Sequence, residues 1–134
     1  LDVAMEASEK IPVVYLQYAL ARIAAIERKA SETGLDPSAD ADLSLLVHES
    51  EEGLIKTLLQ FPDEIRQAAD ARGPHRQAVY LREVATAFSA FYRDCRIIGE
   101  EESLADARLQ LAQASRTVLA NGLAILGIGA PESM

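Results

Sequence analysis

The sequence is poor in cysteine, in aromatic residues and in long apolar runs. Its 134 residues include one cysteine, no tryptophan and only 5% aromatic residues. The lone Cys95 excludes an internal disulfide and fits a reducing compartment. No apolar run reaches the roughly 18 residues needed to span a bilayer, and no basic-then-apolar start marks a signal peptide. We therefore expect a soluble, cytoplasmic protein without a membrane segment.

Motifs of familiar active sites are also missing. The chain has no glycine-rich phosphate loop after a strand, no GxSxG and no paired-cysteine motif. A di-metal carboxylate bundle needs Glu-x-x-His, but Leu45 and Arg72 stand three positions before His48 and His75. Cys95 has no neighbouring base and is interpreted as a small helix-face residue. The sequence thus predicts no catalytic residue and no metal site, so the chain alone is not expected to be an enzyme.

Basic residues are outnumbered by acidic ones. Thirteen Lys and Arg face 21 Asp and Glu, which gives a formal net charge of −8. Because neutralising phosphates requires a basic surface, this balance argues against nucleic-acid binding unless the fold gathers a local positive patch.

What the sequence does contain is helical pattern. Ala and Leu dominate, β-branched residues are scattered and no convincing strand appears. Glycine and proline separate the helical segments. We predict an all-α, antiparallel bundle of about five helices in a single domain, residues 1–134. The predicted helical segments are Ile11–Thr33, two short pieces at Ala41–His48 and Ser50–Gln60, then Phe61–Ala71, His75–Asp94 and Leu104–Leu126.

The first predicted helix has a core face and, beside it, a second stripe. At about 100° per residue, the apolar positions fall on one broad side. They are Leu16, Ala19, Leu20, Ile23, Ile26 and Ala30. The neighbouring stripe contains Tyr15, Tyr18, Arg22 and Lys29, two aromatics and two cations at helical spacing. Such a stripe could stack unpaired bases and bind phosphates, or the tyrosines could be ordinary residues at the edge of the core.

Two residues of the last predicted helix are interpreted as structural. Arg108 lies on its apolar stripe, where a cation needs a carboxylate or carbonyl partner, so we expect it to tie this helix to a neighbour. Gly122 on the same stripe indicates that another helix approaches closely. The loop from Arg96 to Ser103, with its three consecutive glutamates, is interpreted as a solvated connection.

Several ordered segments resemble the C-terminal domain of arginyl-tRNA synthetase. The segment 15–22, Tyr-Leu-Gln-Tyr-Ala-Leu-Ala-Arg, is similar to the start of that domain, and 106–109, Asp-Ala-Arg-Leu, to the Asp-Ala-Leu-Arg-type motif that names the fold. The ending, residues 119–134, resembles the family's Leu-Gly-Ile stop followed by Ala-Pro-Glu-Arg-Met. Pro74-His75 and Tyr80-Leu81 fit the family's penultimate long helix, so the resemblance covers Ile11 to Met134. Two departures are Leu20, where the family has histidine, and Ser133, where it has arginine.

The resemblance implies an anticodon-binding domain of the class I aminoacyl-tRNA synthetase type. The parent would be an arginine–tRNA ligase using ATP and Mg²⁺, while this domain itself would hold no cofactor. Its partners would be the anticodon loop of tRNA and the catalytic domain of the same chain, and we expect a monomer. The chain starts at Leu1 and lacks an active site, so it is interpreted as a fragment of a longer synthetase. The residues that the resemblance implies in tRNA binding are Tyr15, Tyr18, Arg22, Arg28, Tyr92 and Met134, and the helical stripe adds Lys29.

Two hypotheses follow. The first is an anticodon-loop recognition module in which tyrosines stack on bases. In it, Tyr15, Tyr18 and Arg22 form one wall of a pocket, Tyr92 lies nearby and Met134 closes it. Arg28 fits less well, because on the wheel it points away from the two tyrosines. The alternative is a helical interaction protein that has the same fold but no role in aminoacylation.

Overall fold

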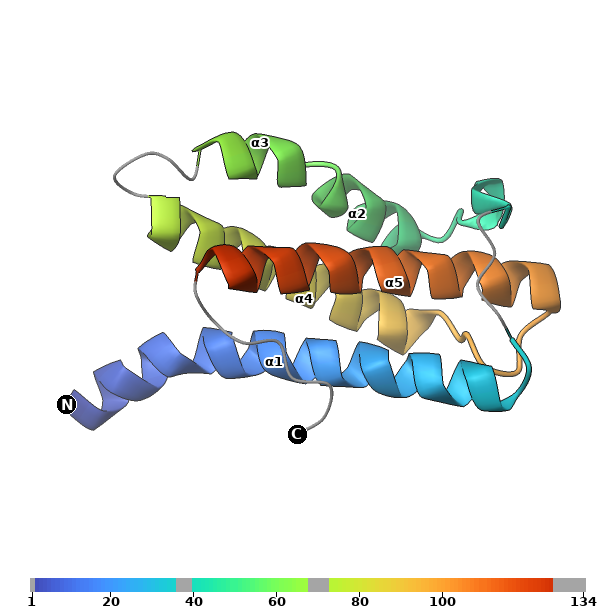
Figure 1. The fold of residues 1–134 in the computed structure, drawn as a ribbon, viewed down its shortest axis with the longest axis horizontal. Helices are drawn as coiled ribbons and strands as arrows, with labels where there is room; N and C mark the ends of the chain where they lie inside the picture. Colours follow the sequence, from blue (N-terminus) through green and yellow to red (C-terminus); the bar gives the residue numbers. More distant parts are fainter. Residues whose placement is uncertain (1, 36–39, 68–72, 127–134) are drawn as a thin grey trace.

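The computed structural model describes the backbone of residues 2–35, 40–67 and 73–126, and the side chains of 14–35, 40–67 and 75–126. Within these ranges all regular secondary structure is helical, which confirms the predicted fold class (Figure 1). The elements in chain order are α1 (Asp2–Glu32), the 3-10 helix η1 (Leu43–Leu45), α2 (Glu49–Leu58), α3 (Phe61–Gln67), α4 (Gly73–Asp94) and α5 (Glu102–Ile125).

Three long helices form the centre of the bundle. α1, α4 and α5 pack against one another, and α2 and α3 cover α4 on the far side from α1. α5 runs antiparallel to both α1 and α4, and α2 runs antiparallel to α4 (Figure 1). α1 and α4, in contrast, run in the same direction, because α2 and α3 return the chain to its starting end. The C-terminal halves of α1 and α4 therefore lie at the same end of the bundle.

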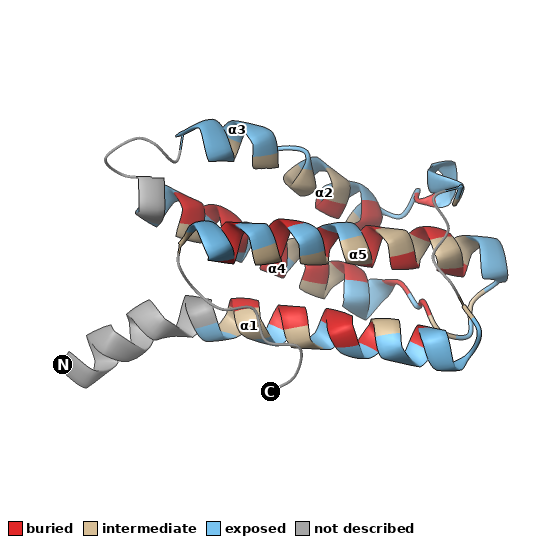
Figure 2. Cartoon of the chain, in the orientation of Figure 1, coloured by how far each residue is buried: buried red, intermediate tan, exposed pale blue. Residues whose placement is uncertain are grey.

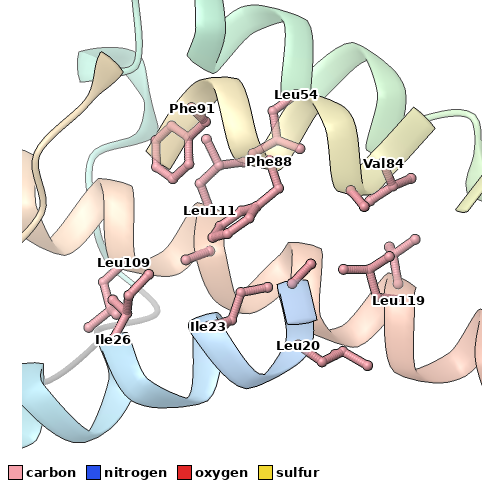
Figure 3. Close-up of a cluster of buried hydrophobic side chains, with 14 of the residues drawn as sticks. Leu20, Ile23, Ile26, Leu54, Val84, Phe88, Phe91, Leu109, Leu111 and Leu119 are labelled. Atoms are coloured by element: carbon pink, nitrogen blue, oxygen red, sulfur yellow. The ribbon is translucent and has the colours of Figure 1, made fainter. Parts of the chain in front are cut away.

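The core lies where these helices face one another (Figures 2 and 3). All six apolar residues predicted for the core face of the first helix are buried. Leu20 and Ile23 of α1 belong to one buried cluster with Val84 and Phe88 of α4 and Leu119 of α5 (Figure 3). Burying aliphatic and aromatic side chains of this size contributes about 1.5–3 kcal/mol each. The amphipathic pattern of α1 is thus what orients its polar stripe outward.

The close approach expected at Gly122 is present between α5 and α4. A Cβ built on Gly122 would lie 2.8 Å from Cδ1 and 3.0 Å from Cγ of Leu81. Leu81 is itself completely buried. The two helices can therefore pack at this distance only because residue 122 has no side chain.

Several predicted boundaries were wrong. α1 begins at Asp2 rather than Ile11 and continues through Pro12, whose missing N–H removes only one backbone hydrogen bond from a long helix. The expected helix at Ala41–His48 is reduced to the 3-10 turn of η1, since Asp42 caps it and only Leu46 there is buried. α3 ends at Gln67, and residues 68–71 of its predicted range lie outside the described residues.

The N-terminus of α2 also differs from the prediction. The predicted segment starts at Ser50, but α2 starts at Glu49 and its N-cap is His48, whose Nδ1 accepts a hydrogen bond from the Ser50 N–H at 3.0 Å. The Glu51 side chain accepts in turn from the His48 N–H at 2.8 Å, which completes a capping box. The predicted solvated loop at the glutamates is likewise partly structural, because Glu101 caps α5 by accepting from the Leu104 N–H.

Candidate nucleic-acid interface

A groove of about 650 Å³ runs between the C-terminal halves of α1 and α4 and the loop that follows α4. One wall is the outer side of α1, and the other is the end of α4 with the first residues of the loop to α5. The side chains that line it are Arg22, Ala25, Ile26 and Lys29 from α1, and residues 92–98 from α4 and the loop.

The lining is strongly basic in an otherwise acidic chain. Among the described residues, the lining contains four cations, Arg22, Lys29, Arg93 and Arg96, and one carboxylate, Asp94. Lys29 and Arg93 lie in the last turns of their helices, where they also offset the negative end of the helix dipole. A chain of net charge −8 thus has the local positive patch that nucleic-acid binding requires.

Asp94 is held by neighbours on both sides. Arg93 donates from Nε at 2.9 Å, and the Ser50 hydroxyl donates to the other carboxylate oxygen. These hydrogen bonds, that from Arg93 first, lower the pKa of Asp94 to about 2. The carboxylate is therefore ionised at neutral pH and cancels much of the charge of Arg93, which leaves Arg22, Lys29 and Arg96 as the groove's main cations.

Arg22 and Tyr92 meet across the groove. The guanidinium carbon of Arg22 lies 4.9 Å from the centroid of the Tyr92 ring, a cation–π contact between α1 and α4. Phe88 packs against Tyr92 one turn earlier, with ring centroids 6.3 Å apart. These two contacts hold the Tyr92 ring in position. The side chain is still 44% exposed, so it remains accessible to a ligand.

The two tyrosines of the predicted stripe have different surroundings. Tyr18 is 59% exposed and lies one turn before Arg22 on α1, beyond the residues that line the groove. Tyr15 is half-buried, and its hydroxyl forms a 3.0 Å hydrogen bond with Oγ of Ser89 on α4. Tyr18 is therefore available to a ligand, whereas Tyr15 packs α1 against α4.

The other residues implied in tRNA binding also differ in whether they line the groove. Lys29 lines the groove, whereas Arg28 is exposed and does not line it. Met134 lies outside the described residues, and so does the pocket closure that was assigned to it.

Arg108 has the kind of partner that its position on the apolar stripe requires. Its Nε donates to Glu51 of α2 at 2.7 Å, and the Arg108 side chain is 12% exposed. The Glu51 side chain is 1% exposed, so this is a buried ion pair that joins α5 to α2.

The sequence prediction missed Arg93 and Arg96. Their signal was present, since residues 92–96 read Tyr-Arg-Asp-Cys-Arg in a chain with only 13 basic residues. Cys95, which lies between Arg93 and Arg96 in the sequence, is buried, and this burial raises the pKa of its thiol. Both properties are typical of a packing residue rather than of a nucleophile. No three His, Cys, Asp or Glu side chains among the described residues could together hold a metal ion. Across the same ranges, every helix is too short or too polar to cross a bilayer.

Known proteins share this sequence and this fold. A family model for the DALR anticodon binding domain matches residues 16–134. The chain is 60% identical over 134 residues to the arginine–tRNA ligase of Salinibacter ruber, and 51% identical over 136 residues to that of Symbiobacterium thermophilum. Each alignment covers all of this chain and 24% of the relative, so the chain spans about a quarter of the length of these curated relatives.

Solved structures agree. The arginyl-tRNA synthetase of Thermus thermophilus matches 90% of this chain with a TM-score of 0.78 and 36% identity, and the match covers 21% of that protein. A putative arginyl-tRNA synthetase from Campylobacter jejuni matches 92% of this chain with a TM-score of 0.79 and 25% identity, over 26% of its own length. The resemblance found in the sequence is confirmed: the chain belongs to the DALR anticodon binding domain family.

Proposed function

We propose that residues 1–134 form the anticodon-recognition module of an arginine–tRNA ligase. The observation that carries this proposal is the groove where Arg22 lies over Tyr92, because it gathers four cations beside an accessible aromatic ring in an acidic chain. The family and the similar arginine–tRNA ligases support the same function.

The groove suits a single-stranded RNA loop. Unpaired bases stack on aromatic side chains, and two exposed rings offer such surfaces: Tyr92, in contact with Arg22 in the groove, and Tyr18, one helix turn before Arg22 on α1. Arginine can bind a phosphate with two nitrogens at once, and Lys29 adds a point charge further along α1. In this proposal Tyr15 contributes by fixing α1 against α4, Arg28 at most by its charge, and Met134 closes the pocket at the chain's end.

The remainder of the ligase would supply the chemistry. We propose that a catalytic domain of the same polypeptide uses ATP and Mg²⁺ to join arginine to the tRNA, and that this chain contributes only tRNA binding. We propose that this ligase is monomeric and cytoplasmic.

The test is the KM of the full-length ligase for tRNA. Replacing Arg22 with Gln, or Tyr18 with Ala, should raise the KM for tRNA about fivefold or more, because a charged hydrogen bond or a base stack is worth about 1–3 kcal/mol. The KM values for arginine and ATP should not change.

A matched control is Arg82→Gln, since Arg82 is an exposed arginine of α4 that does not line the groove. It should leave all three KM values unchanged. If Arg22→Gln and Tyr18→Ala behave like Arg82→Gln, the alternative of a helical interaction domain is favoured and the recognition function is wrong.

A further inference from the structure

The ion pair of Arg108 and Glu51 is linked by a hydrogen bond to the loop that lines the groove. While Nε of Arg108 donates to Glu51, its Nη1 donates to the backbone carbonyl of Arg96 at 2.8 Å. Glu100 lies 3.6 Å from the same Nη1. The partly buried guanidinium of Arg108 thus binds α2 on one side and the loop between α4 and α5 on the other.

Glu51 is itself fixed. One of its oxygens completes the capping box of α2 through the His48 N–H, and the other accepts from Arg108. Both carboxylate oxygens are used, and the side chain is 1% exposed. The position of Arg108 is therefore set by the rigid N-terminus of α2.

The residue whose carbonyl is held is also a wall of the groove. The Arg96 side chain is 70% exposed and lines the groove, and its nearest carboxylate partner, Glu100, is 4.0 Å away. A contact at that distance on an exposed side chain is weak. Side-chain contacts therefore restrain Arg96 little, and its main restraint is the hydrogen bond from Arg108 to its backbone carbonyl.

We propose that Arg108 is a positioning residue for RNA binding, and that the residue it positions, Arg96, binds a phosphate of the anticodon loop. This rests on the proposed function of the groove. Arginine is needed at position 108 because its planar fork donates along two directions at once, to Glu51 and to the Arg96 carbonyl. Lysine would keep the charge beside Glu51, but its donors share one nitrogen, which cannot occupy the positions of both Nε and Nη1 of arginine.

The test uses the salt dependence of tRNA binding to the full-length ligase, measured by fluorescence anisotropy over a range of KCl concentrations. For single-stranded nucleic acid, each phosphate contact contributes roughly 0.7 to the slope of log Kd against log salt concentration. Arg96→Ala should weaken binding about fivefold at moderate salt, as expected for one screened contact, and lower the slope by roughly 0.7.

Arg108→Lys is the decisive variant, because it leaves the net charge of the protein unchanged. We expect it to lower the slope by the same amount as Arg96→Ala, and the double variant to be no worse than either single one. Arg116→Lys is the matched control: Arg116 of α5 pairs with Glu27 of α1 at 3.0 Å and lies away from the groove. It should reduce the melting temperature slightly and leave the slope unchanged.

The inference is overturned if Arg108→Lys lowers only the melting temperature, or if its effect on Kd adds to that of Arg96→Ala. Should Arg108→Lys fail to fold, Glu51→Gln replaces it. Weakening the ion pair that holds Arg108 should also lower the slope of log Kd against log salt concentration, and an unchanged slope would overturn the inference. The proposed function fails separately, since in that case Arg22→Gln would also leave tRNA binding unchanged.

Discussion

Two glycines in helices are expected to respond oppositely to the same substitution. Gly122 of α5 and Gly53 of α2 both lie inside helices, yet their surroundings differ. A Cβ on Gly122 would approach three atoms of the buried Leu81 side chain within 3.0 Å, whereas a Cβ on Gly53 would meet nothing within 4 Å. Replacing each glycine with alanine therefore separates helix propensity from packing.

The magnitude follows from two opposing terms. Alanine is favoured over glycine inside a helix by about 0.8–1 kcal/mol. Forcing a methyl group into a packed core costs about 1–3 kcal/mol. Gly53→Ala should therefore stabilise the domain by up to about 1 kcal/mol, whereas for Gly122→Ala the packing cost offsets that gain and leaves a net destabilisation of up to about 2 kcal/mol. Near the midpoint, each kcal/mol corresponds to a melting-temperature shift of about 3–5 °C for a chain of this length.

The assay is thermal unfolding followed by circular dichroism, with Gly53→Ala as the control. A third variant tests the contact itself. Leu81→Ala removes the atoms that the new methyl group would meet, so Leu81→Ala with Gly122→Ala should be less destabilised than the sum of the two single variants. If Gly122→Ala raises the melting temperature as Gly53→Ala does, α4 and α5 are not packed as closely as the structure shows.

Two further predictions concern titrating groups. The Tyr80 hydroxyl donates to the Thr57 carbonyl at 2.7 Å, and burial, followed by the charges of Glu64 and Glu83, raises the pKa of Tyr80 to about 12. Because this pKa exceeds the ordinary value of 10, the neutral tyrosine stabilises the fold fully below about pH 10, and that contribution is lost as the pH rises through 12. Tyr80→Phe should cost about 1 kcal/mol at pH 7 and flatten the alkaline decline, measured by urea unfolding at several pH values; an equally steep decline would contradict the assignment. Asp94→Asn removes the one carboxylate among the described residues that line the groove, so it should strengthen tRNA binding about two- to fivefold at low salt, and unchanged or weaker binding would argue against an electrostatic role for the groove.

The helical pattern made the fold and half of the interface predictable. The period of α1 separates a buried face from a polar stripe, so the core residues and the outward direction of Tyr18 and Arg22 follow from the sequence alone. The same geometry explains why Tyr15 differs: three residues before Tyr18, it is rotated by about 60° and reaches Ser89 of α4.

The rest of the interface depends on contacts between distant segments. Arg93 and Arg96 become part of the groove only because α1 and α4 run in the same direction and bring their C-terminal ends together, which no local pattern predicts. The segment before α2 was wrongly predicted as a helix for a related reason. Its leucines fit a helix, but Leu43 and Leu45 find no core to cover, so only a short 3-10 turn forms.

The central claim is that the groove between α1 and α4 binds the anticodon loop. Its most direct test is an NMR titration of the 134-residue chain with an RNA hairpin that carries an arginine anticodon. The account predicts that the ring signals of Tyr18 and Tyr92 and the Nε–H signal of Arg22 shift together, and that a hairpin with an unrelated anticodon shifts them less. If these signals stay unchanged while residues elsewhere respond, or if both hairpins act equally, the claim is contradicted.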